Sequence, residues 1–250
     1  MFLDFSAVQI AAILGAYVFA ATAKGITGLG FSTTCLPILA LLVGLKDALP
    51  LVIIPSVCSN LVVMRQAGHF SATVRRFWPM LLATLPGLAL GLLTLSYIDG
   101  VQAGAIFGVT LLLWCGFSFA KPDLRLPNGW ERPLAPVSGF VTGALNGMTG
   151  SQVMPSVPFL MTLHLDRNQF IQACNCSFTL SSFVMAFGLG QLGLFPRDAL
   201  VISILGTCFI FVGLRMGSAI RHRLSEKLFR LGVLAMLSLM GLGLILPALN

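Results

Sequence analysis

Two short glycine-rich stretches carry the residue types that could bind a small anion. They are residues 24–28 (Lys-Gly-Ile-Thr-Gly) and 146–150 (Asn-Gly-Met-Thr-Gly), and each interrupts an apolar run. A shift of 122 positions superposes them and sets Lys24 opposite Asn146. A helix that restarts after such a break begins with free N–H groups and the positive end of its dipole. Each break therefore predicts a site for an oxyanion.

Lys24 is the basic residue of the first break, and no acidic residue occurs between Asp4 and Asp47. A charge inside a membrane is costly and is by default a functional hypothesis. We therefore expect Lys24 to neutralise an anionic substrate. The alternative is a lysine at a helix end whose ammonium extends to the membrane surface.

Short polar side chains near the breaks complete the candidate substrate site. Asn60 lies four positions after Ser56, while Asn175, Thr179 and Ser182 follow the i, i+4, i+7 spacing of one helical face. Such a face can line a pathway or form hydrogen bonds between helices, and small residues also serve ordinary helix packing. The predicted substrate-binding set is Lys24, Gly25, Thr27, Gly28, Ser32, Asn60, Asn146, Gly147, Thr149, Gly150, Ser151, Gln152 and Asn175.

The composition sets the class of protein that must position these residues. Hydrophobic residues make up 57% of the 250 residues and charged residues only 9%, against about 25% charged in soluble domains. The chain is therefore predicted to be an all-α polytopic membrane protein, with no nucleic-acid partner. Stretches of about 20 apolar residues can each cross a bilayer. Apolar segments occur near 5–23, 28–45, 48–64, 77–97, 101–120, 134–150, 152–164, 168–190, 198–219 and 229–248.

The polar linker 121–133 divides these segments into five and five. We expect an N-terminal repeat over 1–120 and a C-terminal repeat over 134–250, the linker being cytoplasmic. The first two segments of each repeat are predicted to form a broken or re-entrant hairpin. Segment 152–164 has 13 residues and is too short to cross a core about 30 Å thick. The pair at 5–45 is longer and could instead make two full crossings.

The basic residues indicate whether the two repeats cross the membrane in the same or in opposite directions, because cytoplasmic connections are rich in lysine and arginine. Alternating five-segment halves place twelve basic residues on one side and only Lys46 and Arg197 on the other. An odd number of segments inverts the second repeat and leaves both termini outside. Four spans per half would give a parallel repeat and put the basic 215–230 region outside, so inverted repeats are preferred. The twelve are Arg65, Arg75, Arg76, Lys121, Arg125, Arg132, Arg167, Arg215, Arg221, Arg223, Lys227 and Arg230.

Enzymatic chemistry is not indicated by the residue pattern. No histidine, cysteine and carboxylate set recurs at metal-ligand spacing, and no phosphate-binding Gly-x-x-x-x-Gly-Lys-Ser/Thr loop occurs. The six cysteines lie in apolar runs, which favours small buried side chains over disulfides. We expect no metal, no cofactor and no catalysis. Active transport by this chain would use a gradient.

The breaks also carry a family resemblance. Residues 25–37, Gly-Ile-Thr-Gly-Leu-Gly-Phe-Ser-Thr-Thr-Cys-Leu-Pro, and 146–155, Asn-Gly-Met-Thr-Gly-Ser-Gln-Val-Met-Pro, resemble the TauE/SafE (sulfite exporter) family of membrane permeases. The duplicated apolar halves are similar too. The resemblance implies transport of small sulfur-containing anions such as sulfite or organosulfonates, often outward, across a bacterial inner membrane. Family members often have consecutive glycines where this chain has Gly28-Leu29-Gly30.

The residues predict a secondary transporter of a small oxyanion by alternating access, expected to be an exporter, and the resemblance implies that the anion is sulfite or an organosulfonate. Its partners would be this anion and the lipid bilayer. The alternatives are a passive anion channel and a non-transporting membrane accessory subunit.

Overall fold

A computed structural model of the chain describes residues 5–120, 124–127, 129–220 and 225–249, without the side chains of residues 226 and 227. Within this part the chain is all helical and has no strand. The helices are α1 (Ala7–Thr27), α2 (Phe31–Val43), α3 (Leu45–Ala67), α4 (Phe70–Tyr97), α5 (Gly100–Ala120), α6 (Glu131–Thr149), α7 (Ser156–Met161), α8 (Arg167–Gln191), α9 (Arg197–Ile220) and α10 (Glu226–Ile245), followed by a short 3-10 turn, Leu246–Ala248.

Seven helices in the described part of the chain are long and apolar enough to cross a membrane. They are α1, α3, α4, α5, α8, α9 and the stretch Leu228–Ala248 that contains most of α10. Helix α6 has 19 residues, but α2 has 13 and α7 only six. At about 1.5 Å per residue, neither α2 nor α7 can span the bilayer core. The prediction of a polytopic all-α protein is confirmed.

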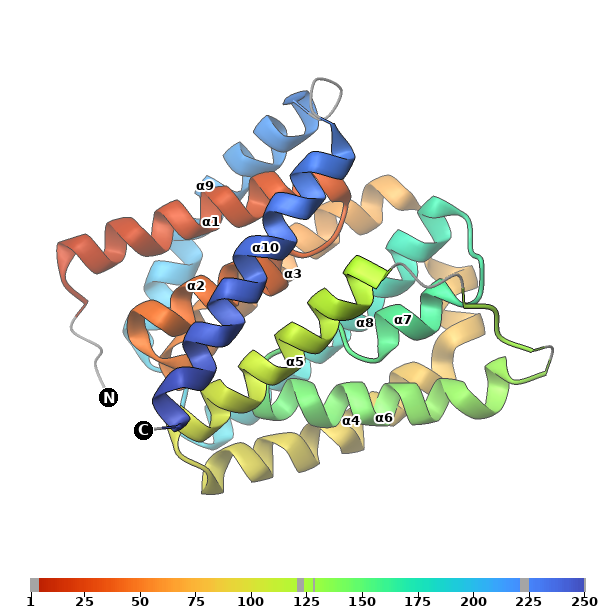
Figure 1. Cartoon of the computed structure of the whole chain (residues 1–250), viewed down its shortest axis with the longest axis horizontal. Coiled ribbons are helices and arrows are strands. Elements are labelled where there is room, and N and C mark those ends of the chain that lie inside the picture. Colours follow the sequence, from red (N-terminus) through yellow and green to blue (C-terminus); the bar gives the residue numbers. More distant parts are fainter. Residues whose placement is uncertain (1–4, 121–123, 128, 221–224, 250) are drawn as a thin grey trace.

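The short helices α2 and α7 are the return arms of two hairpins. In Figure 1, α1 enters from the left and α2 leads the chain back to that side, whereas α6 and α7 form a hairpin from the right. Both termini lie at the lower left of the same view. The first hairpin therefore combines a spanning-length helix with a short return arm, which is neither of the two simple forms considered for residues 5–45.

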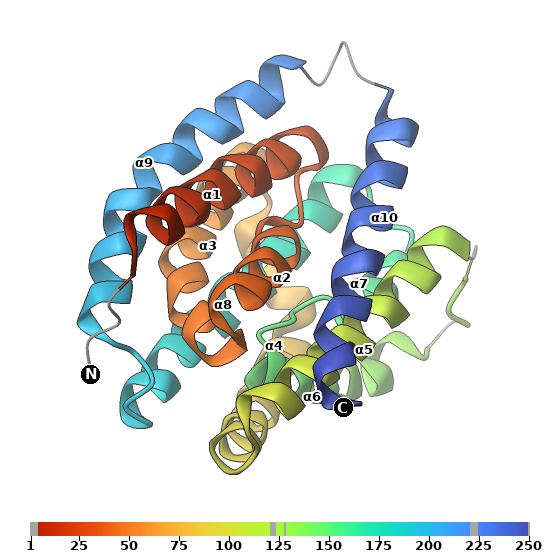
Figure 2. The ribbon, with the colours of Figure 1, turned by 60° about the vertical axis from the view of Figure 1, so that its left-hand side comes forward.

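Glycines bring two helix pairs into close contact, α4 with α6 and α1 with α9. A Cβ atom on Gly143 would lie 2.2 Å from the carbonyl oxygen of Thr84 in α4. A Cβ atom on Gly217 of α9 would lie 2.2 Å from the carbonyl oxygen of Thr22 in α1. Figure 2 shows α1 beside α9 and α5 beside α10. This backbone contact is the small-residue packing typical of membrane helices, and it fixes the helices that carry the breaks.

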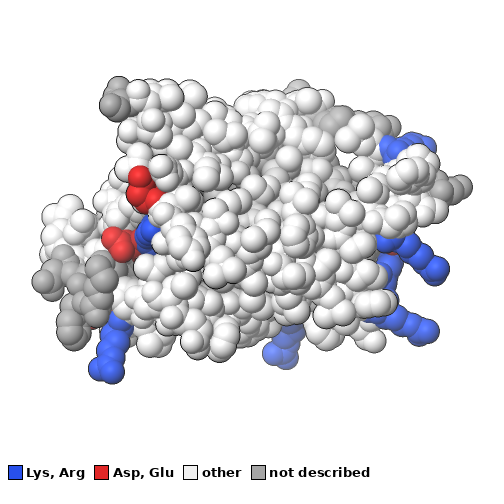
Figure 3. All heavy atoms as spheres, turned by 90° about the horizontal axis from the view of Figure 1, so that it is seen from below, with Lys and Arg blue, Asp and Glu red and all other residues white. Residues whose placement is uncertain are grey.

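Charge is distributed unevenly between the ends of the molecule. Figure 3 shows basic side chains mainly toward the right-hand end and the acidic ones toward the left, with a largely uncharged surface between them. At the start of α6, Glu131 accepts two hydrogen bonds from Arg76 of α4, at 2.7 and 2.8 Å. Of the basic residues used to predict orientation, Lys121, Arg221 and Arg223 lie outside the described residues.

Candidate functional site

The first break lies between α1 and α2. Gly28 and Gly30 have φ angles of 83° and 92°, in the left-handed region that favours glycine. The N–H of Gly28 donates to the carbonyl of Lys24 at 2.7 Å. The Thr27 hydroxyl accepts from the N–H of Leu29 at 3.2 Å and donates to the carbonyl of Ala23 at 3.0 Å. The break is therefore a capped turn with defined geometry.

The second break repeats this geometry after α6. Gly150 has a φ of 74°, and its N–H donates to the carbonyl of Asn146 at 2.7 Å. The Thr149 hydroxyl accepts from the N–H of Ser151 at 3.1 Å and donates to the carbonyl of Leu145 at 2.6 Å. The repeated Gly-x-Thr-Gly sequence thus forms the same turn twice.

The ammonium of Lys24 lies inside the protein. The residue is 1% exposed, so the alternative of a lysine that extends to the surface does not apply. Its Nζ donates to Ser59 Oγ at 3.3 Å, to Asn175 Oδ1 at 3.0 Å and to Asn60 Oδ1. None of these partners carries a charge. The positive charge is therefore solvated by neutral oxygens from α3 and α8, and no carboxylate of the described residues is among its partners.

Asn175 joins the ammonium to the first turn. While its Oδ1 accepts from Lys24, its Nδ2 donates to the carbonyl of Ile171 at 2.8 Å and, more weakly, to that of Gly28 at 3.4 Å. Ser32, at the start of α2, shares a hydrogen bond with Ser56 of α3. The predicted residues Lys24, Gly28, Asn60 and Asn175 are therefore brought together, with Ser59 as a further member.

The second turn has a different polar environment. Asn146 is fully buried, and neither its Nδ2 nor its Oδ1 has a hydrogen-bond partner within the described part of the chain. Gln152 donates to Ser182 Oγ at 3.1 Å, while its own Oε1 is unpaired. Ser151 is 7% exposed. Where the first half has a buried cation, the second therefore has buried neutral groups with unused hydrogen-bonding capacity.

Gly25 and Gly147 lie against neighbouring helices. A Cβ atom on Gly25 would lie 2.6 Å from the Leu214 carbonyl oxygen, and one on Gly147 would lie 2.5 Å from that of Leu88. This contact accounts for glycine at both positions through helix packing. Their role in substrate binding stays a prediction.

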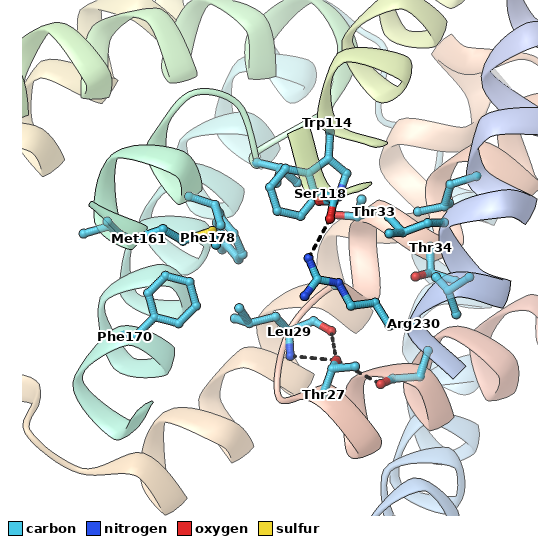
Figure 4. A pocket seen from close by; sticks show the side chains of 18 of the residues that line it. Thr27, Leu29, Thr33, Thr34, Trp114, Ser118, Met161, Phe170, Phe178 and Arg230 are labelled. Carbon is cyan, nitrogen blue, oxygen red and sulfur yellow. Dashed lines mark hydrogen bonds between the residues drawn. The ribbon is translucent and has the colours of Figure 1, made fainter. Parts of the chain in front are cut away.

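Two cavities border the first turn. A cavity of about 200 Å³ reaches Lys24 and Gly28 and is also lined by Gln66 and Ile171. A larger one, of about 610 Å³, borders Thr27 and extends to α5, α8 and α10 (Figure 4). Different residues of the turn therefore line the two cavities, and Arg167 lines both.

Comparison with protein families gives one match over most of the chain. A family model described as Sulfite exporter TauE/SafE matches residues 13–244. The chain belongs to this family. The TauE/SafE match includes both breaks and runs from α1 to the end of α10, so it confirms the resemblance drawn from the sequence. No curated protein and no solved structure matched the chain. Membership assigns the chain to a family of membrane transporters.

Some residues around the TauE/SafE breaks were not found from the sequence. Ser59 is adjacent to Asn60, and its contact with Lys24 depends on how α1 and α3 pack. Arg230 lines the larger cavity, although the sequence identified it only as one of several basic residues that set orientation. Arg230 lies near the start of α10, and no feature of the sequence set it apart from the other basic residues.

Proposed function

We propose that this protein is a secondary transporter that exports a small sulfur-containing oxyanion, sulfite or an organosulfonate, by alternating access. The observation that carries the proposal is the buried ammonium of Lys24, whose three hydrogen-bond partners are all neutral. A buried charge without a counterion is costly. An anion that reaches this position supplies the missing charge.

The surroundings of Lys24 favour an oxyanion in particular. The three N–H groups of an ammonium are engaged, the contact with Ser59 being long at 3.3 Å. An incoming oxygen can replace this contact. The Nδ2 of Asn60 is buried and has no partner, so it offers a second donor close by. Two convergent donors match an anion that carries several oxygens.

The contacts of the two turns support inverted repeats. The side chain of Ile171 in α8 lies against Gly28, 2.9 Å from where a Cβ atom would be. The side chain of Leu49 in α3 lies in the same way against Gly150, at 2.4 Å. The shift of 122 that relates the glycines also relates Leu49 to Ile171. Each turn thus contacts the equivalent position of the opposite half, as expected for a two-fold axis between repeats 1–120 and 134–250.

The approach to the turn is open in the first half of the chain and filled in the second half. This difference supports alternating access. On the first side, Gln66 and Ile171 line the cavity that reaches Lys24. The residue equivalent to Gln66 in the second half is Gly188. The Leu92 side chain fills the space beside it, and its Cδ1 would lie only 2.2 Å from a Cβ atom on Gly188. One approach is open while its counterpart is filled. This is the arrangement expected when a central site opens to one face at a time.

The charge distribution supports an orientation with the basic end in the cytoplasm and both termini outside. The open approach to Lys24 would then face the cytoplasm, since it is lined by Arg167 and Asn168 at the start of α8. A negative interior favours exit of an anion by roughly 2.3 kcal/mol per charge per 100 mV. Export is therefore the expected direction.

Sulfite counterflow in liposomes tests the proposal. Vesicles loaded with unlabelled sulfite should take up labelled sulfite faster than empty vesicles, and Lys24→Met should abolish this acceleration. A passive channel would give flux without acceleration by internal sulfite. An accessory subunit would give no flux and no change in thermal stability with sulfite.

A further inference from the structure

The larger cavity has a structural cause in the unequal return arms. Helix α2 has 13 residues and packs along α10, whereas its counterpart α7 has six and packs mainly against α6 and α8. The shorter arm leaves room between α5, α8 and α10. This room is the cavity of about 610 Å³. It lies in the range of 300–1,000 Å³ typical of sites for drug-sized ligands, and it is much larger than a sulfite ion needs.

The cavity wall is mainly apolar, with the side chain of Arg230 among its aromatic residues. Trp114, Phe170 and Phe178 line it from α5 and α8, and Figure 4 shows the guanidinium of Arg230 pointing into the space between them. Nη2 of Arg230 donates to the carbonyl of Ser118 at 3.0 Å. This bond uses one of the five N–H donors of a guanidinium. The lining also includes Arg167 and His164, and among the side chains that the structure describes it contains no aspartate or glutamate.

Arg230 and Lys24 line two different cavities that both border the first turn. Thr27 and Gly30 border the larger cavity, whereas Lys24 and Gly28 border the smaller one. The two positive groups therefore line different cavities, although Arg167 lines both. A ligand at Arg230 would contact the turn without replacing the ligand at Lys24.

We propose that the larger cavity is a second anion site, which binds an organic anion with an apolar body. The sulfonate or phosphate headgroup binds Arg230, and its ring or chain packs against Trp114, Phe170 and Phe178. This inference rests on the proposed function, because it extends the substrate class from a small oxyanion to an amphipathic one. The same chemistry is offered by a soluble organosulfonate and by the headgroup and chains of an anionic lipid.

Trp114 provides a direct test, because it lines the cavity and only Trp78 and Trp130 need to be replaced by phenylalanine to isolate its fluorescence. Titration with 2-naphthalenesulfonate should quench Trp114 saturably. Arg230→Met should weaken this binding at least tenfold, and Arg230→Lys should retain most of it. Two partial probes, methanesulfonate and neutral 2-naphthalenemethanol, should each bind at least tenfold more weakly.

The source of the ligand is distinguished in nanodiscs of phosphatidylglycerol and of phosphatidylcholine. If the ligand is a lipid, native mass spectrometry should detect it bound to protein from phosphatidylglycerol nanodiscs only. The bound lipid should be absent from Arg230→Met, and it should compete with 2-naphthalenesulfonate. A soluble organosulfonate as the ligand predicts equal binding of the probe in both lipids. Equal affinity for the sulfonate and the alcohol, unchanged in thermally stable Arg230→Met, would overturn the proposal. Sulfite counterflow measured on the same samples would then show whether the proposed function survives.

Discussion

Nζ of Lys24 donates to Oδ1 of Asn175 at 3.0 Å, and the two residues are 151 positions apart. They belong to different halves of the chain, so neither half can form this ammonium site alone. Because Asn175 also donates to the carbonyl of Gly28, a displacement of α8 relative to α1 changes both the turn and the solvation of the charge. The site is therefore sensitive to the motion by which a transporter would expose it.

Removal of the charge at position 24 should weaken substrate binding. Hydrogen bonds to charged groups contribute about 1.5–3 kcal/mol, so Lys24→Met should reduce sulfite affinity roughly 10- to 100-fold. The measurement is the sulfite-dependent shift in melting temperature, followed by counterflow. Lys46→Met is the matched control, because Lys46 donates to the carbonyl of Ile98 near the opposite end of the molecule. Equal sulfite affinity in Lys24→Met and the native chain would exclude the assigned role.

A carboxylate placed beside Lys24 should compete with the substrate. Asn175→Asp changes the partner of the ammonium from a neutral amide to an anion at nearly constant shape. We expect sulfite binding to fall at least tenfold while the melting temperature is maintained or rises, because the buried charge gains a counterion. Gln191→Glu adds the same charge at the exposed far end of α8 and should leave sulfite binding unchanged. Undiminished sulfite binding in Asn175→Asp would argue against an anion at this position.

Replacement of the threonine in either turn should have an equivalent effect on stability and transport. Thr27→Val and Thr149→Val each remove a hydroxyl that accepts one backbone hydrogen bond and donates another. At about 1 kcal/mol for each bond, both variants should lower the melting temperature and slow counterflow. Thr22→Val is the control, because that hydroxyl bonds only to the Val18 carbonyl within α1. Effects no larger than that of the control would contradict a structural role for the repeated turn.

Glycine contacts between α4 and α6 should be sensitive to a single methyl group. Gly143→Ala would place its Cβ 2.2 Å from the Thr84 carbonyl oxygen, and overpacking of this kind typically costs about 1–3 kcal/mol. Gly116→Ala meets no heavy atom within 4 Å and should be neutral or slightly stabilising, since alanine favours helix by up to about 1 kcal/mol. Thermal unfolding in detergent compares the two. A similar melting temperature for both variants would mean that the helices separate readily.

Leu92 is predicted to seal the second approach. Leu92→Ala removes the side chain that fills the space over Gly188, so sulfite should leak across the membrane without acceleration by internal sulfite. Leu93→Ala on the same helix is the control, because Leu93 is 55% exposed. Counterflow and net efflux from loaded vesicles separate coupled exchange from leak. Full coupling in Leu92→Ala would place the seal elsewhere.

Much of the fold follows from local sequence. The apolar segments 101–120 and 168–190 correspond to α5 and α8 within a residue or two, because apolar length and polar ends decide them. The segment near 5–23 was predicted too short, since α1 continues through Lys24 to Thr27. A lysine within an apolar helix is stable there only because Asn60 and Asn175 solvate it, and these partners come from distant parts of the chain.

The candidate site was less predictable for the same reason. Asn60 and Asn175 stand out because amides are uncommon in apolar segments, and both lie beside Lys24. Gly25 and Gly147 were grouped with them by repetition alone, whereas their close neighbours are the backbones of α9 and α4. The sequence showed only part of the difference between α2 and α7, 13 residues against six, because the corresponding predicted segments 28–45 and 152–164 have 18 and 13 residues.

The unequal length of the return arms also affects the free-energy difference between the inward-facing and outward-facing forms. A molecule built from two identical inverted halves would have its inward-facing and outward-facing forms at equal free energy, with equal populations in the absence of a solute. Arms of different length pack against their neighbours to different extents, so they remove this degeneracy. The resting population is then biased toward one face before any gradient acts, and the length of α7 is the natural parameter with which to tune that bias.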